Sequence, residues 1–259
     1  MTILVFTDLD GTLLDHQTYS FSAAQPALSE LRRRGVPLVL ASSKTAAEIE
    51  PLHEQLDLGG APMIVENGAA CIWPQQTGVV QDTDYRTIRT VLSEAPESLR
   101  KCFSGFGDMS IDCVMAHTGL SVHSAQKARK RLYSEPGIWS GENDGLKDFL
   151  RYLQENGVSA RQGGRFLTLS LGGTKAGQMH RIIDHYRADV TIALGDAPND
   201  IEMIQAADFG VIIKNTHSAA LPPMKGEENA RIRRSILPGP QGWNAAVLAI
   251  LDELDRQEV

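Results

Sequence analysis

The chain has 259 residues, which is long enough for one large domain or two moderate ones with a buried core. Hydrophobic residues (42%) and charged residues (22%) are in ordinary proportion for a globular protein, and the net charge of −7 argues against nucleic-acid binding, which needs a basic surface. We find neither an apolar run of the roughly 18 residues that a membrane-spanning helix needs nor a signal-peptide pattern, so we expect no membrane partner and a cytoplasmic location.

The first predicted element is a strand over residues 3–7, an apolar run that ends in Asp8 and Asp10, followed by Gly11 and Thr12. In an open α/β sheet the carboxyl ends of the strands form the rim where ligands bind, so both carboxylates are expected at the lip of a crevice. Carboxylates this close repel each other unless a cation lies between them, and Mg²⁺ is usual where a phosphate is also handled. Alternatively, Asp8 and Asp10 are turn and capping residues after the strand.

A helix is predicted over residues 22–34, because leucines recur at helical spacing and Gly35 closes the segment. The next strand, residues 36–41, is continuously apolar, as strands buried in a parallel sheet are, so the first unit is β-α-β. Residues 42–45, Ser-Ser-Lys-Thr, follow at its end and begin another helix with a capping box. A third strand (residues 62–66) and the turn Glu66-Asn67-Gly68 suggest a hairpin with residues 69–73.

From residue 82 to residue 165 the pattern changes to helices interleaved with short strands. This stretch holds 12 Lys and Arg against 11 Asp and Glu, a net charge of +1, so the remainder carries −8. A nearly neutral insert in an acidic chain predicts a separate module, and its basic cluster at residues 127–131 is typical of a solvated helix face. Helices are expected at residues 83–95, 121–132 and 143–156, and extended segments at residues 137–140 and 165–171.

After residue 165 the chain returns to the first pattern of alternating strands and helices. The whole chain has three cysteines, Cys71, Cys102 and Cys113, which we interpret as buried thiols in a reducing compartment. Residues 222–242 are rich in Pro, Gly and charge and are expected to form a loop before a closing amphipathic helix. The other expected elements are a helix at residues 174–187, a strand at 190–194, the loop Gly195-Asp196-Ala197-Pro198-Asn199-Asp200, a strand at 209–213 and the closing helix at 243–254.

Polar side chains at the strand ends and helix starts match phosphoryl transfer through an aspartyl-phosphate. Asp8 is the expected nucleophile, and Asp10 protonates the departing alcohol and then deprotonates the attacking water. Ser42 is expected to donate to the phosphoryl oxygens, and Lys175 to offset charge on Asp8 and on the phosphate. Ser42 is equally compatible with an ordinary cap, with Ser43 as the alternative, and Lys175 with a solvated helix position.

The expected cofactor is Mg²⁺. Asp196 and Asp200 would complete a carboxylate cage for it together with Asp8, and Asp10 is a further expected metal ligand through its backbone carbonyl. Three polar groups crowd the loop that holds Asp196, directly after an apolar strand, which is hard to explain as a purely structural feature.

Residues 8–14, Asp-Leu-Asp-Gly-Thr-Leu-Leu, resemble the first motif of the haloacid dehalogenase superfamily of phosphatases. The motifs at Ser42, Lys175 and Asp196 follow in that superfamily's order, and the insert resembles the large C2B-type cap of its Cof-like sugar-phosphatase branch. The Ser-Lys-Thr form of the second motif, with a set of further motifs, is similar to the mannosyl-3-phosphoglycerate phosphatase family. Those motifs are Glu66-Asn67-Gly68, Gly105-Phe106-Gly107-Asp108-Met109, Arg131-Leu132-Tyr133-Ser134-Glu135-Pro136 and Gly163-Gly164-Arg165-Phe166-Leu167.

The resemblance implies an α/β fold: a Rossmann-like doubly wound parallel sheet core, residues 1–81 and 166–259, with an inserted α+β cap domain, residues 82–165. It implies hydrolysis of 2-O-mannosyl-3-phosphoglycerate to mannosylglycerate and phosphate, a step in making a compatible solute. Arg165, beside two glycines, is then the expected clamp for an anionic sugar or glycerate substrate, although a plain salt bridge is an alternative. The other expected substrate contacts are Ser43, Lys44, Glu66, Asn67 and Asn199.

Three other functions are compatible with the same residues. One is a phosphatase of another sugar phosphate, such as glucosyl-3-phosphoglycerate or sucrose phosphate. A phosphomutase and a metal-dependent binding protein that has kept the fold without turnover are the other two.

Overall fold

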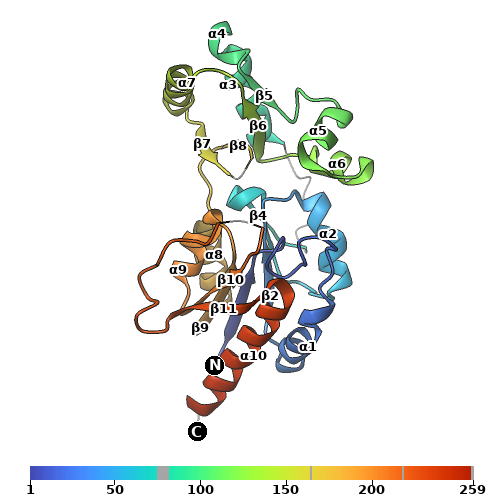
Figure 1. Cartoon of the computed structure of the whole chain (residues 1–259), viewed down its shortest axis with the longest axis vertical. Helices are drawn as coiled ribbons and strands as arrows, with labels where there is room; N and C mark the ends of the chain where they lie inside the picture. Colours follow the sequence, from blue (N-terminus) through green and yellow to red (C-terminus); the bar gives the residue numbers. More distant parts are fainter. Residues whose placement is uncertain (75–81, 164, 218, 258–259) are drawn as a thin grey trace.

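The computed structural model of the chain describes residues 1–74, 82–163, 165–217 and 219–257, and it contains two sheets (Figure 1). The larger has seven strands in the order β11-β10-β9-β1-β2-β3-β4, and the smaller has four in the order β5-β6-β8-β7. The predicted fold class, a parallel α/β sheet with an inserted α+β unit, is confirmed. The strands of the large sheet are β1 (Ile3–Thr7), β2 (Leu38–Ala41), β3 (Met63–Val65), β4 (Ala70–Ile72), β9 (Val190–Gly195), β10 (Phe209–Lys214) and β11 (Ile232–Pro238).

Strand β1 lies in the middle of the large sheet and is buried along its whole length. It pairs in parallel with β2 and β9, so that Thr7 lies opposite Leu40 on one side and Leu194 on the other. The pairs of β9 with β10, β10 with β11 and β2 with β3 are also parallel, whereas β3 and β4 form the predicted antiparallel hairpin. Because parallel strands share one direction, the carboxyl ends of β1, β2, β9 and β10 lie along one edge of the sheet.

Helices cover both faces of the large sheet, because the residues of β1 alternate between two apolar layers. Val5 packs in the layer of α1, α2 and α10, and Phe6 in the layer of α8 and α9. Trp243 of α10 is fully buried, and its indole N–H donates to the Thr7 hydroxyl over 3.0 Å, which fixes α10 beneath the end of β1. These helices are α1 (Gln25–Arg34), α2 (Ala46–Gln55), α8 (Lys175–Tyr186), α9 (Ile201–Ala206) and α10 (Gly239–Gln257).

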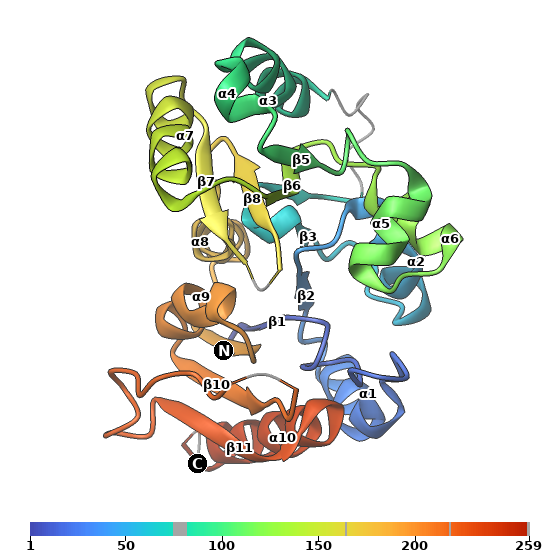
Figure 2. The same ribbon diagram turned by 45° about the horizontal axis from the view of Figure 1, so that its top comes forward.

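The smaller, antiparallel sheet forms the centre of the cap, which lies at the opposite end of the molecule from the two termini (Figure 1). One apolar cluster joins this sheet to α3 and α7, and another joins it to α5 and α6, which lie beside core helix α2 (Figure 2). The cap elements are α3 (Thr83–Glu94), α4 (Glu97–Arg100), β5 (Phe103–Gly105), α5 (Ile111–Thr118), α6 (Val122–Ala128), β6 (Ser134–Trp139), α7 (Asn143–Glu155), β7 (Ser159–Gln162) and β8 (Leu167–Ser170).

The predicted second boundary between core and cap, at residues 165 and 166, precedes a strand of the cap sheet. Strand β8 pairs with β6 and β7, so we propose that the cap extends to Ser170. The first boundary, at residues 81 and 82, borders residues 75–81, which lie outside the described residues.

Two predictions about the elements are wrong. The helix expected at residues 121–132 ends at Ala128, because the chain turns there to bring its next residues against the core. The loop expected at residues 222–242 contains β11 and the start of α10. Strand β11 is the edge of the sheet and carries arginines, which protect an edge from further pairing but hide the apolar alternation of a strand.

The three cysteines are free and half-buried, not fully buried as expected. Among the described residues, no helix has both the length and the apolar character needed to cross a membrane.

Candidate active site

The carboxyl edge of the large sheet brings together the four polar segments singled out in the sequence. Asp8 and Asp10 follow β1, Ser42 follows β2 and Asp196 follows β9, and these three strands are neighbours. Lys175 is the first residue of α8, behind a Thr174 hydroxyl that accepts the Gly177 N–H. The polar residues of these four segments therefore meet at one place, although Asp8 and Asp196 are 188 positions apart in the chain.

Lys175 is buried and links two carboxylates. Its ammonium group lies 2.6 Å from Asp8 Oδ1 and 2.7 Å from Asp200 Oδ1. Burial alone would lower the pKa of Lys175, but attraction to Asp200 and Asp8 outweighs it and the pKa is raised, so the side chain stays charged. The solvated helix position considered from the sequence is excluded, since Lys175 is 2% exposed.

Close backbone packing sets the place of Lys175. A Cβ on Gly68 would lie 2.0 Å from the Thr174 carbonyl carbon, and one on Gly173 would lie 2.3 Å from the Gly68 carbonyl oxygen. The amide of Gln178 also donates to the Gly68 carbonyl over 3.1 Å. Glycine at positions 68 and 173 therefore lets the turn after β3 press against the start of α8.

Asp196 is held by two donors that come from other strand ends. The Thr12 hydroxyl and the Asn215 amide each lie 2.6 Å from one of its carboxylate oxygens. Burial is the main cause that raises the pKa of Asp196, with Asp200 adding to it. Asn215 was not among the predicted site residues, but its position directly after β10 is the same signal that identified Asp8 and Asp196.

Three carboxylates, those of Asp8, Asp196 and Asp200, can each offer an oxygen atom within 4.8 Å of the others, and all three side chains are buried. Burial raises the pKa of Asp8 well above its ordinary value, and Asp200 and Asp196 raise it further against the opposing attraction of Lys175. One ammonium group cannot balance three ionised carboxylates, so the site has an excess of negative charge that a cation would compensate. A hard divalent cation such as Mg²⁺, which prefers carboxylate oxygens, fits these donors.

The carboxylate of Asp10 lies outside this group. Its Oδ2 atom is 2.5 Å from the Lys44 ammonium group, which also lies 5.4 Å from the centre of the Tyr19 ring. Its other oxygen, Oδ1, is buried and has no hydrogen-bond partner among the described residues. The side chain is therefore not placed to bind a metal with the other three. Its part in proton transfer and a role for its backbone carbonyl stay predictions.

The two serines after β2 differ in exposure. Ser42 is 1% exposed, and its hydroxyl accepts the Lys44 N–H over 3.3 Å. Ser43 is exposed and lines a cavity of about 280 Å³ between the core and the cap. Of the other predicted substrate contacts, Lys44, Asn67, Asn199 and Arg165 also line this cavity, as does Asp10.

Arg165 reaches the cavity from the cap. Its guanidinium group donates to the backbone carbonyls of His117 (2.9 Å) and Thr118 (3.4 Å) and lies 5.8 Å from the centre of the Phe166 ring. Within the described ranges it forms no ion pair with a carboxylate, so the plain salt bridge considered as an alternative is not found. Gly164, one of its two neighbouring glycines, lies outside the described residues.

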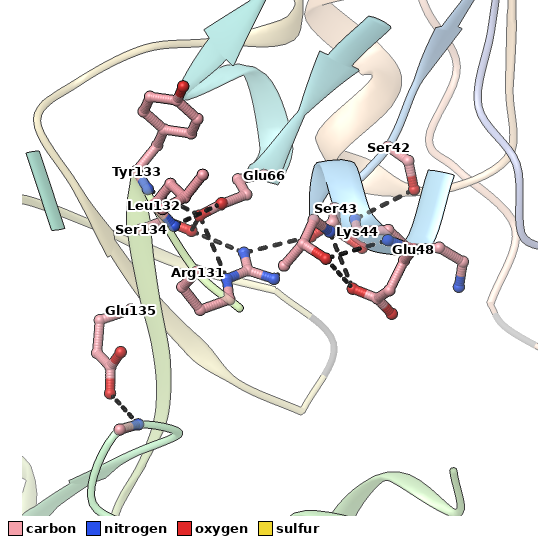
Figure 3. Close-up of polar contacts among 12 residues, drawn as sticks. Ser42, Ser43, Lys44, Glu48, Glu66, Arg131, Leu132, Tyr133, Ser134 and Glu135 are labelled. Carbon is pink, nitrogen blue, oxygen red and sulfur yellow. Dashed lines mark hydrogen bonds and ion pairs between the residues drawn. The ribbon is translucent and has the colours of Figure 1, made fainter. Parts of the chain in front are cut away.

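Glu66 does not line the cavity, contrary to its prediction as a sugar contact. Its carboxylate is buried against the cap, where it accepts hydrogen bonds from Leu132, Tyr133 and Ser134 (Figure 3). Asn67, the next residue, instead accepts the side-chain amide of Asn199 over 3.0 Å at the cavity wall. Glu66 and Asn67 therefore point in different directions, one toward the cap and the other toward the cavity, because the turn that they form is tight.

Comparison with known proteins identifies the family. The sequence matches the haloacid dehalogenase-like hydrolase family over residues 5–97 and 140–223. The chain belongs to the haloacid dehalogenase-like hydrolases. The resemblance seen in the sequence is thereby confirmed, as is the expectation that this family member is a hydrolase.

Two relatives in this hydrolase family match almost the whole chain. A protein of Persephonella marina named glucosyl-3-phosphoglycerate/mannosyl-3-phosphoglycerate phosphatase is 32% identical, over 98% of this chain and 99% of its own. A protein of the same name from Methanococcoides burtonii is 31% identical, over 97% and 98%. A crystal structure of a haloacid dehalogenase-like hydrolase from Bacteroides thetaiotaomicron has the same fold, with a TM-score of 0.70 and 20% identity over 96% of this chain and 100% of that one.

Proposed function

We propose that the protein is a Mg²⁺-dependent phosphatase that hydrolyses a glycosyl-3-phosphoglycerate through an aspartyl-phosphate on Asp8, with 2-O-mannosyl-3-phosphoglycerate as the favoured substrate. The observation that carries this proposal is that two neighbouring carboxylates, those of Asp8 and Asp10, have different surroundings. Asp8 contacts Lys175 within the buried acidic group, whereas Asp10, two residues away, keeps one oxygen without a partner among the described residues. One carboxylate is suited to nucleophilic attack and the other to proton transfer.

In the first step, an oxygen of Asp8 attacks phosphorus and the bond from phosphorus to the leaving oxygen breaks. Asp10 gives its proton to that leaving oxygen, which departs as an alcohol. In the second step, Asp10 takes a proton from water, which attacks the same phosphorus and releases inorganic phosphate and the Asp8 carboxylate.

Lys175 and the Ser42 hydroxyl would stabilise negative charge on the transferring phosphoryl group, where electrostatic positioning supplies most of the acceleration. Mg²⁺ bound by Asp8, Asp196 and Asp200 would supply the remaining positive charge. Thr12 and Asn215 orient Asp196, because each binds one of its oxygens and so limits its rotation.

The cavity beside Asp10 supports a leaving group that is both anionic and rich in hydroxyl groups. Its volume of about 280 Å³ is just below the usual range of ligand sites, and the amide groups of Asn67 and Asn199 can hydrogen bond with sugar hydroxyls. Arg165 uses one N–H of each terminal nitrogen for backbone carbonyls, and three of its five donors remain for a glycerate carboxylate.

A glucosyl substrate is the second candidate, since the names of both relatives carry glucosyl-3-phosphoglycerate as well as the mannosyl compound. The test is phosphate release from both glycosyl-3-phosphoglycerates, sucrose phosphate and 4-nitrophenyl phosphate, each with Mg²⁺ and with EDTA. We expect release with Mg²⁺ only and the highest kcat/KM for the mannosyl compound. Release that does not depend on metal, or no release from any compound, would contradict the proposal and favour a binding protein.

A further inference from the structure

The turn after β3 has an unusual backbone. Glu66, Asn67 and Gly68 all lie in the left-handed region, with φ of 52°, 61° and 88°. For a residue with a side chain this conformation is unfavourable, and it persists where the surroundings fix it. The three residues face different parts of the molecule, since Gly68 contacts the start of α8, Asn67 lines the cavity, and Glu66 faces the cap.

Glu66 binds the cap with both carboxylate oxygens. Its Oε1 accepts the Leu132 N–H over 3.0 Å, and its Oε2 accepts the Tyr133 N–H over 3.2 Å and the Ser134 hydroxyl over 2.7 Å. The Arg131 Nε atom lies 3.2 Å from Glu66 Oε2, and the side chains of Glu66 and Arg131 are 1% and 5% exposed, respectively. Four consecutive cap residues are therefore attached to one buried core carboxylate (Figure 3).

Arg131 extends this attachment to the loop after β2. It donates to the Ser43 carbonyl from both terminal nitrogens, over 3.2 and 3.3 Å. The backbone N–H groups of Glu66 and Asn67 donate to the carbonyls of Lys44 and Ser42, each over 2.9 Å. All three carbonyls of residues 42–44 are thus held by the turn or by the cap residue bound to it.

Other polar contacts between cap and core are isolated ones. Among the described residues they include a hydrogen bond of 3.0 Å from the Thr45 hydroxyl to the Lys127 carbonyl and the ion pair of Arg161 with Glu202. Both side chains of that ion pair are more than half exposed, so solvent screens it. The pair formed by Glu66 and Arg131 is the buried one, and it lies beside the predicted phosphate-binding residue Ser42.

We infer that Glu66 and Arg131 are positioning residues that fix the cap against residues 42–44, so that Arg165 on the cap is held at a set place opposite Asp10 and Lys44. The effect of this positioning on catalysis rests on the proposed function. A buried ion pair of this kind contributes little net stability because both charges lose their hydration, but it permits one arrangement of the groups that it joins.

Arg131→Lys tests this inference, because lysine keeps the charge beside Glu66 but cannot also reach Ser43 and Ser134. We expect KM for 2-O-mannosyl-3-phosphoglycerate to rise about tenfold, as for the loss of one hydrogen bond from a charged group, with a much smaller change for 4-nitrophenyl phosphate, which does not span the cavity. The matched control is Arg233→Lys, since Arg233 also joins a glutamate, Glu253, and a backbone carbonyl, but lies on β11. Equal losses on both substrates, or the same loss in the control, would overturn the inference.

Amide hydrogen exchange gives a readout that needs no activity. The amides of Leu132 and Tyr133 donate to Glu66, so Arg131→Lys should speed their exchange about tenfold while the amides of β6 stay protected. Unchanged exchange would overturn the inference even if the proposed phosphatase activity holds, and faster exchange would support it even if no substrate is hydrolysed. If Arg131→Lys does not fold, Ser134→Ala removes the hydroxyl that both charged groups share, and the same pattern is expected with a smaller size.

Discussion

Replacing the proposed nucleophile should leave the fold intact and should not weaken it. In Asp8→Asn the side chain keeps its size, but the buried group loses one of three carboxylates that lie around a single lysine. We expect turnover to vanish, because an amide oxygen is too weak a nucleophile for attack on phosphorus. The stability of the metal-free protein follows from the balance of charges.

That balance can be worked from the distances. An oxygen of Asp8 lies within 4.8 Å of an oxygen of each of its two acidic neighbours, so at an effective dielectric constant of 20 each repulsion is at least about 3.5 kcal/mol. The attraction to Lys175 at 2.6 Å is about 6 kcal/mol on the same scale, so removing the charge leaves these terms nearly balanced. The burial cost of the Asp8 charge then decides the sign, and we expect a gain of up to about 3 kcal/mol.

The assay is thermal and urea unfolding of the wild type and Asp8→Asn in EDTA and in Mg²⁺. In EDTA the variant should unfold at the same temperature or a few degrees higher, at about 2–4 °C for each kcal/mol in a chain of this size. Mg²⁺ should raise the unfolding temperature of the wild type more than that of the variant, because the variant has one anionic ligand fewer.

The control variant is Asp255→Asn. It removes an exposed carboxylate bound to Arg34 and should change neither turnover nor the response to Mg²⁺. A loss of more than about 2 kcal/mol for Asp8→Asn in EDTA would refute the charge balance, since it would place net attraction where we find repulsion. Wild-type turnover in Asp8→Asn would refute the role of nucleophile.

The other predictions concern pH, proton transfer and the cap. Because the pKa of Asp8 is raised on folding, the folded metal-free protein binds this proton more tightly than the unfolded chain does. The free energy of unfolding in EDTA should therefore fall as the pH rises above the ordinary carboxyl pKa of 3.8, and it should fall less in Asp8→Asn; equal slopes would contradict the raised pKa. Asp10→Asn should lower turnover at least about 100-fold in steady-state assays, because the proton donor is lost, and a wild-type rate would exclude that role. Arg165→Ala should lower kcat/KM for a glycosyl-3-phosphoglycerate about 10- to 100-fold, as for a lost charged hydrogen bond, but far less for 4-nitrophenyl phosphate; an equal loss would make Arg165 structural.

The sequence was informative wherever a local pattern records burial. The apolar run before Asp8 and the polar loop after residue 194 both predict a strand that ends at the rim of a sheet, and the structure has both. The capping box of Thr45 and Glu48 is also confirmed. Strand β11 escaped prediction because an edge strand buries too little to show an apolar alternation.

The sequence by itself determined the strands of the large sheet up to β10 and the identity of the acidic residues at the sheet edge, since both follow from neighbours in the chain. Only the tertiary structure decided which side chains pair: that Lys44 binds Asp10, that Asn215 binds Asp196, and that Glu66 faces the cap. The physical reason is separation along the chain. Glu66 lies 65 or more positions before its partners in the cap, and no pattern over a few residues records a hydrogen bond that forms only when two distant segments meet.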